Sequence, residues 1–315
     1  VFLAFIVSFF LFVPTILEMS TNKIYGDQEQ YFPEISKETK DLMKDLWIAD
    51  LHTDSLLWPR NLNERSDIGH VDVPRLLEGN IALQAFTIVT SVPFGMKIES
   101  NEKPDRFSDM LTMKALVELW GMDSFSELAA RTIYQTDKFH QMAKESDGAF
   151  FEIQTKRDLR KYLKIRKQNN VTAGFLGIEG LHALDGDIDN VDRFFNAGVR
   201  MMAPTHFFDN DVGGSAHGVN KGGLTDLGKE VVRRANEKNI ILDVAHASVA
   251  VIEDVVKLST HPVVSSHTGF KGICDSMRNL RDEEIRLIAN TGGVLGVGYF
   301  KPTQCGDDIL SSIVR

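Results

Sequence analysis

The sequence has few cysteines and no excess of basic residues. Only two of its 315 residues are cysteines, and 35 Lys and Arg stand against 44 Asp and Glu, which gives a net charge of -9. Because nucleic-acid binding needs a basic surface, this balance argues against a nucleic-acid partner. No C-x-x-C pair occurs, so we expect no thiolate metal site. Cys274 and Cys305 are either two separate small core residues or a disulfide, which an exported protein can form.

One long hydrophobic run lies at the start of the sequence. Residues 1–17 are uncharged and just long enough to cross a bilayer. The alternative is a signal-peptide core, but no Ala-x-Ala-like cleavage site follows, which favours an uncleaved membrane anchor. No Met or basic residue precedes the run, so we expect the sequence to begin inside it. Either alternative places the folded part outside the cytoplasm. Residues 18–45 are polar and predict a stalk, and residues 46–315 predict the folded domain.

Short apolar runs alternate with amphipathic segments from residue 46 onward. The apolar runs predict strands at 46–54, 81–90, 172–179, 199–206, 240–246, 262–267 and 292–299. The amphipathic segments predict helices at 189–197, 226–238, 249–258 and 282–290, the second and fourth capped by Asp226 and Asp282. This alternation indicates an α/β protein with a parallel sheet covered by helices. Length suits one barrel or two smaller domains.

The interval between residues 90 and 172 interrupts the alternation. It is rich in helix-forming residues and contains a short apolar run at 149–153. We expect an elaborated connection with one long helix over about residues 106–144, of the kind that shapes a site or an interface. The seven predicted strands are one fewer than a closed (β/α)8 TIM barrel needs. We therefore expect the last strand to follow Arg315.

Metal-capable side chains stand where several of the apolar runs end. They are His52, Asp54, Glu179, His206, His246 and His267. Singly, each has an ordinary explanation, such as a core histidine, an N-capping aspartate or a glutamate in a salt bridge. In a parallel barrel, however, the carboxyl ends of the strands share one mouth, which carries the catalytic groups. Together the six residues predict a metal-dependent hydrolase.

The spacing of these residues predicts two cation sites. Side chains two residues apart on a strand share a face, so His52 and Asp54 can bind one ion. His246 and His267 end consecutive strands and can bind a second. Glu179 can bridge both ions, since a buried carboxylate needs a charge partner. These ligands suit Zn²⁺, with Mn²⁺ or Co²⁺ as alternatives, and two ions ~3.5–4 Å apart would acidify a bridging water.

Three further residues are candidates for other roles. His206 is not needed as a ligand, so we expect it to stabilise an oxyanion or move a proton, unless it is a core histidine. Arg278 follows the His267 strand and can hold a substrate carboxylate in bidentate fashion, unless it forms a surface salt bridge. His217 lies in a glycine-rich loop, residues 213–218, that predicts a mobile rim.

Six segments of the chain together resemble the renal (membrane) dipeptidase family of zinc peptidases. They are DLHTD at 50–54, GIEGLH at 177–182, APTH at 203–206, LDVAH at 242–246, SSH at 265–267 and MRNL at 277–280. The resemblance covers residue 46 to the end. It implies a (β/α)8 barrel with two zinc ions per chain that hydrolyses dipeptides. It assigns His52 and Asp54 to one zinc, Glu179 as the bridge, His246 and His267 to the other zinc, and His206 and Arg278 to the substrate.

The sequence departs from the family pattern at two points. Thr53 replaces the usual residue between the histidine and the aspartate, and the family's active-site aspartate on the eighth strand is not among these 315 residues.

Two other functions remain as alternatives. One is a different amidohydrolase, acting on N-acyl amino acids at the same site. The other is an inactive barrel that serves as a binding module. A homodimer is an additional expectation.

Overall fold

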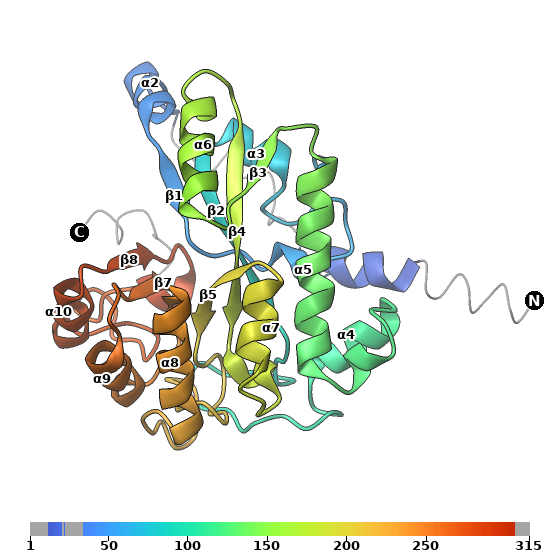
Figure 1. Ribbon diagram of the computed structural model, residues 1–315. Helices are drawn as coiled ribbons and strands as arrows, with labels where there is room; N and C mark the ends of the chain where they lie inside the picture. Colours follow the sequence, from blue (N-terminus) through green and yellow to red (C-terminus); the bar gives the residue numbers. More distant parts are fainter. Residues whose placement is uncertain (1–11, 21, 23–33, 306–315) are drawn as a thin grey trace, which may run out of the picture. The chain divides into compact units, whose positions relative to one another are not determined.

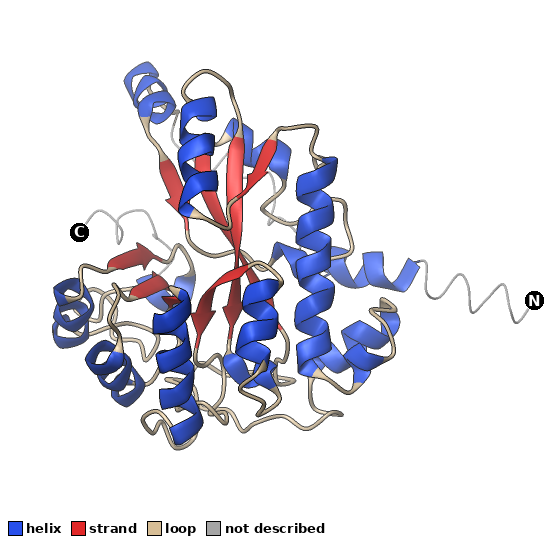
Figure 2. Ribbon diagram, in the orientation of Figure 1, coloured by secondary structure: helices blue, strands red, loops and turns tan. Residues whose placement is uncertain are grey.

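Strands and helices alternate along most of the chain, as Figures 1 and 2 show. The structure is a computed structural model and describes residues 12–20, 22 and 34–305. Its strands are β1 (Ile48–Asp50), β2 (Ile81–Val89), β3 (Phe150–Glu152), β4 (Thr172–Glu179), β5 (Val199–Ala203), β6 (Ile241–Leu242), β7 (Val264–Thr268) and β8 (Val294–Val297). Its α-helices are α2 (Lys37–Asp45), α3 (Val73–Glu78), α4 (Met110–Val117), α5 (Leu128–Glu145), α6 (Lys156–Arg166), α7 (Asn190–Asn196), α8 (Asp226–Lys238), α9 (Val249–Leu258), α10 (Asp282–Asn290) and α11 (Lys301–Gln304). Short 3-10 helices are η2 (Ser55–Leu57), η3 (Asp123–Phe125) and η4 (Leu181–Leu184).

The chain divides into two compact units. The first comprises residues 1–86 and 137–175, and the second comprises residues 87–136 and 176–315. Strands β2 and β4 run from one unit into the other along the chain. In the first unit β1 pairs with β2 and β3 pairs with β4, both in parallel. Tyr162 of α6 packs in its core and donates a hydrogen bond to the carbonyl of Ala82.

The second unit carries the other parallel pairs. Strand β4 pairs with β5, β5 pairs with β6, and β7 pairs with β8. A parallel bridge between Asp243 and Val264 joins the end of β6 to β7. Helices α7, α8, α9 and α10 pack one against the next beside these strands (Figure 1). The carboxyl ends of β4, β5 and β6 and strand β7 therefore follow one another in space, which confirms the parallel α/β class.

Three of the four predicted helices have the observed bounds: α8, α9 and α10. The fourth, α7, is one residue shorter at each end than predicted. The predicted caps are wrong by one residue. Thr225 precedes α8 and its side chain accepts the Gly228 N–H, while Asp282 is the first residue of α10. Amphipathic periodicity locates these helices well because each buries one face only.

The long helix predicted at 106–144 is wrong. Helix α4 ends at Val117, η3 follows, and α5 begins at Leu128. The break lies at Leu119 and Gly121, whose φ angles of 56° and 107° are incompatible with a continuing right-handed helix. The run at 149–153 contains β3, so the described residues hold eight strands, one more than predicted. Closure into a complete (β/α)8 barrel stays a prediction.

The amino-terminal prediction falls mainly outside the described residues. Residues 1–11 are not described, whereas residues 12–20 are helical. Glu18 is buried, and its carboxylate accepts a hydrogen bond of 2.9 Å from Arg60 in the same unit. No helix in the described part of the chain is both long and apolar enough to span a membrane. The anchor and the stalk stay predictions.

The two cysteines form a disulfide. Cys274 and Cys305 lie 31 residues apart, and their Cα atoms are 5.1 Å from each other. This outcome confirms the second of the two alternatives that the sequence left open. The bond closes a loop that includes α10 and β8, and such loops restrict the unfolded chain.

Candidate metal centre

Four of the predicted site residues lie at neighbouring positions in the second unit. Glu179 is the last residue of the fully buried strand β4. The chain turns at Gly180, whose φ of 90° favours glycine. His206 follows β5, and His246 follows β6 in a left-handed conformation with φ 63°. His267 lies within β7 and not at its end, which corrects the predicted strand boundary.

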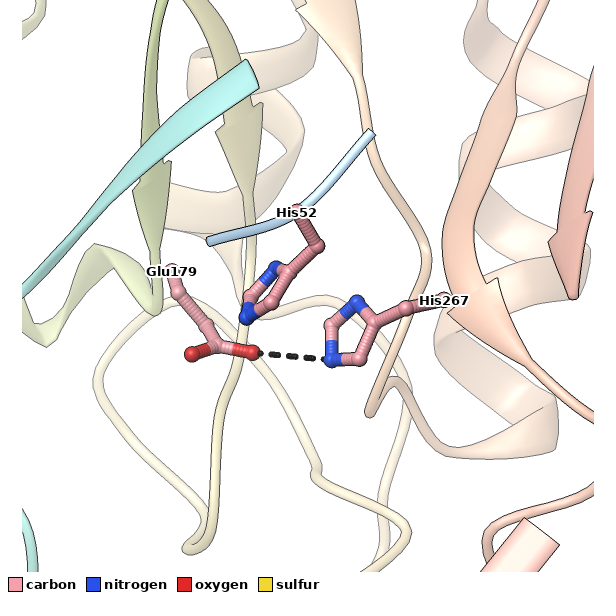
Figure 3. Close-up of side chains that lie close together, drawn as sticks. All are labelled: His52, Glu179 and His267. Atoms are coloured by element: carbon pink, nitrogen blue, oxygen red, sulfur yellow. Dashed lines mark ion pairs between the residues drawn. The ribbon is translucent and has the colours of Figure 1, made fainter. Parts of the chain in front are cut away.

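The side chains of these residues converge on the Glu179 carboxylate. Its Oε1 lies 3.0 Å from His246 Nε2 and 3.3 Å from His267 Nε2, as Figure 3 shows for the latter. Its Oε2 lies 3.2 Å from His206 Nε2. The Nε2 atoms of His246 and His267 are 3.1 Å apart. The two oxygens thus face different histidines.

The donor atoms of this cluster fit a metal ion. Ligands on a tetrahedral Zn²⁺ at ~2.0–2.2 Å lie about 3.3 Å from one another, close to the separations seen here. Burial lowers the pKa of His246 well below its ordinary value, and the positive charge of Arg278 adds to this effect. A neutral imidazole carries a lone pair that can bind a metal. Glu179, His206 and His246 are all buried, and their possible ligand atoms lie within 4.8 Å of one another.

The remaining two predicted ligands lie in the first unit. His52 Nε2 is 3.5 Å from Asp54 Oδ1, so this pair can share one cation. The reason given from the sequence is wrong, however, because β1 ends at Asp50 and neither residue belongs to a strand. The pair comes together instead in the loop before η2. Asp50, which the sequence did not single out, accepts the His52 N–H at 3.0 Å, and burial raises the pKa of its carboxyl group.

Arg278 is buried and not a surface residue. Its Nη2 donates to the carbonyl of His267, and its guanidinium lies over the ring of Phe300 at 5.8 Å. The Nε of Arg278 has no hydrogen-bond partner among the described residues. Burial lowers the pKa of Arg278 to about 10, so the side chain is still cationic at neutral pH. A buried cation with an unused donor suits an anionic ligand.

His217 is also buried, which contradicts its predicted place on a mobile rim. Its Nδ1 lies 2.6 Å from the carbonyl oxygen of Ile98. A carbonyl only accepts, so this nitrogen donates and Nε2 keeps the lone pair. Burial lowers the pKa of His217 to about 4. Its ring centre lies 5.0 Å from that of His246, and no sequence signal beyond the residue type indicates this contact.

A family profile matches most of the chain. The profile of the membrane dipeptidases, peptidase family M19, matches residues 36–306. The chain belongs to the membrane dipeptidase family. An uncharacterised dipeptidase of Schizosaccharomyces pombe is 26% identical over 235 residues, which are 74% of this chain and 52% of that protein. The chain thus spans about half the length of this curated relative.

Solved structures of membrane dipeptidase relatives share the fold. A metallopeptidase of Rhodobacter sphaeroides, solved with a phosphinate mimic of L-Ala-D-Ala, is 22% identical with a TM-score of 0.63, over 85% of this chain and 81% of that one. The probable dipeptidase PvdM of Pseudomonas aeruginosa is 20% identical with a TM-score of 0.66, over 85% of this chain and 64% of that one. At these identities the comparison concerns the fold alone.

Proposed function

We propose that this membrane dipeptidase homologue hydrolyses dipeptides at a site holding two zinc ions. The observation that carries the proposal is the convergence of His206, His246 and His267 on the two oxygens of the buried Glu179 carboxylate. Membership of the membrane dipeptidase family supports the substrate class. The assignment of His52 and Asp54 to one of the two ions rests on the sequence pattern and on their own 3.5 Å contact.

Each residue has a defined task in this proposal. When bound, two zinc ions would polarise the peptide carbonyl and lower the pKa of water. Glu179 would hold one ion through each oxygen, with His246 and His267 on the Oε1 side. His206, beside Oε2, would donate a hydrogen bond from its ring N–H to the oxyanion that develops on the substrate. Arg278 would hold the free carboxylate of the dipeptide.

A metal analysis combined with a substrate panel tests the proposal. Purified full-length protein should contain about two zinc ions per chain, lose activity with a chelator and regain it with Zn²⁺. The panel should include L-Ala-D-Ala, because a mimic of it was bound by the Rhodobacter sphaeroides metallopeptidase. Fewer than about one zinc per chain together with no hydrolysis would contradict the proposal and favour a binding module.

Blocked substrates separate the proposal from its nearest alternative. A dipeptidase should lose activity when the substrate's amino group is acetylated. Hydrolysis of N-acyl amino acids at a rate equal to or above that of dipeptides would assign the site to a different amidohydrolase. Both outcomes leave the metal site in place, so the panel tests the substrate and the metal analysis tests the site.

An oxidising location is part of the proposal. The Cys274–Cys305 disulfide supports it, because disulfides persist outside the cytoplasm and are rare inside it. Thiol alkylation of protein taken directly from its native cells should label neither cysteine before reduction. Labelling of both would place the protein in a reducing compartment. Membrane attachment and a homodimer stay predictions.

A further inference from the structure

Asp243 is a buried acidic residue immediately after β6. Its Oδ1 accepts the backbone N–H groups of Ala245 at 3.0 Å and Ser266 at 2.9 Å. Its Oδ2 accepts the Ser266 hydroxyl at 2.5 Å. Asp243 is only 3% exposed, so these three hydrogen bonds offset the cost of burying its carboxylate. The two bonds to Ser266 also connect the segment after β6 to β7.

Ser266 connects this carboxylate to the metal centre. Its Oγ lies 2.8 Å from His267 Nδ1. A hydroxyl has one hydrogen, and a carboxylate can only accept. The hydroxyl hydrogen therefore points to Asp243, and the hydroxyl oxygen accepts the N–H of His267 Nδ1. This chain of two hydrogen bonds keeps a proton on Nδ1.

The opposite nitrogen of His267 is the one that faces the site. Its Nε2 lies 3.3 Å from Glu179 Oε1 and 3.1 Å from His246 Nε2. A proton held on Nδ1 leaves Nε2 as the nitrogen whose lone pair can bind a cation. If Nδ1 lost its proton, the neutral ring would carry one on Nε2, directly between the ligand atoms. The direction of the Ser266 hydroxyl thus decides whether His267 is a ligand.

We propose that Asp243 and Ser266 are positioning residues that hold His267 in its metal-binding tautomer. The proposal rests on the metal site of the proposed function and goes beyond it, because it assigns roles to two residues outside the ligand set. Hydrogen-bond partners of ligating histidines typically contribute ~10–100-fold to metal affinity. The particular feature here is that a hydroxyl, whose direction can be reversed, stands between the carboxylate and the imidazole.

Asp243→Asn reverses that direction without changing the shape of the side chain. The amide oxygen must keep facing the two backbone N–H groups, so the amide NH₂ meets Ser266 Oγ and donates to it. The hydroxyl then donates to His267 Nδ1, which moves the ring proton to Nε2. Ser266→Ala is milder, because it removes the partner of Nδ1 and leaves both tautomers accessible. In the Asp243→Asn, Ser266→Ala double variant no hydroxyl can donate to His267 Nδ1, so the additional effect of Asp243→Asn disappears.

Zinc affinity of the full-length protein tests this reasoning, measured by competition with a chromophoric chelator. We expect a loss of ~10-fold for Ser266→Ala and ~100-fold for Asp243→Asn. The double variant should recover to the level of Ser266→Ala. Ser265→Ala is the matched control, since its buried hydroxyl on the same strand has no hydrogen-bond partner among the described residues. It should bind zinc as the wild type does.

Nitrogen-15 NMR of histidine-labelled, metal-free protein gives a second measurement. His267 Nδ1 should carry a proton in the wild type and none in Asp243→Asn. An unprotonated Nδ1 in the wild type, or an Asp243→Asn variant that binds zinc as well as Ser266→Ala, would overturn the proposal. Wild-type protein that binds no zinc would contradict the proposed function instead, and the NMR measurement would still decide the role of Asp243 and Ser266.

Discussion

Two buried polar clusters of the second unit differ in how completely their charges are matched. In the first, the Arg131 guanidinium donates to Asp109 Oδ2 at 2.5 Å and to the carbonyls of Thr90 and Ser124 at 2.7 Å. It also donates to Thr112 Oγ1 at 2.7 Å. One cation and one anion thus meet with every guanidinium nitrogen engaged. Such a cluster is complete within the chain itself.

The second cluster consists of Glu179 and the three histidines around it. Its atoms are one carboxylate and three imidazole nitrogens, which converge to 3.0–3.3 Å. No arginine or lysine is among these four residues, in contrast to the cluster around Arg131. Since both clusters are buried, burial alone does not distinguish a structural cluster from a functional one. The distinguishing property is the composition of the cluster, because a carboxylate and three imidazole nitrogens at one point form a set of ligands that suits Zn²⁺.

Replacement of Glu179 should have the largest effect on activity. Glu179→Gln keeps the shape of the side chain but removes the negative charge of the carboxylate. That charge faces His206 on one side and His246 and His267 on the other. We expect kcat/KM to fall by ~10³-fold or more, about 4 kcal/mol, with loss of bound zinc. Stability of the metal-free protein should change little, because an amide is less costly to bury than a carboxylate. Unchanged zinc content and activity would refute the bridging role.

Replacement of Arg131 should affect stability and not zinc binding. Arg131→Met leaves the Asp109 carboxylate buried without its cation, which typically costs about 3 kcal/mol or more. Urea denaturation measures this loss, and zinc affinity of the folded fraction should stay constant. Arg233→Met is the control, because this exposed arginine pairs with the half-buried Glu230 and the exposed Glu237 on α8, and its loss should not shift the midpoint. A loss of zinc affinity in Arg131→Met would contradict the purely structural role of the Arg131 cluster.

The two clusters also differ in how far the sequence predicts them. All four members of the Glu179 cluster could be found, because each ends or follows an apolar run on successive strands. Arg131 and Asp109 could not, since they lie in the interval where the pattern failed and one long helix was predicted in place of α4 and α5. Helix bounds for α8 to α10 followed from periodicity. Hydrogen-bond partners leave no such periodic signal.

Local backbone geometry explains the other failures. β1 ends at Asp50, so His52 and Asp54 meet through a loop and not through strand alternation. Asp243 interrupts the apolar run at 240–245, and an acidic residue inside a buried run is a signal that could have drawn attention to it. Its hydrogen bonds to Ser266 depend on the bridge between Asp243 and Val264, which needs the structure.

Replacement of His206 should separate catalysis from metal binding. His206 faces Glu179 Oε2, whereas His246 and His267 face Oε1. If it acts on the substrate, His206→Asn should lower kcat ~100-fold, as expected for loss of one oxyanion donor, and leave zinc content unchanged. His246→Asn is the matched comparison and should lower zinc content as well. Equal zinc loss in both variants would make His206 a metal ligand.

Arg278 should give the smallest effect and the most selective one. Its buried Nε has no hydrogen-bond partner among the described residues, in contrast to Arg131, whose three guanidinium nitrogens all donate. Arg278→Lys keeps the charge but loses bidentate geometry, so KM for dipeptides with a free carboxylate should rise ~10-fold. KM for carboxyl-amidated dipeptides should not change, and Arg281→Lys, a half-exposed neighbour paired with Glu284, serves as the control. An equal rise for amidated substrates would mean that Arg278 matches an internal group, as Arg131 does, and belongs with the structural cluster.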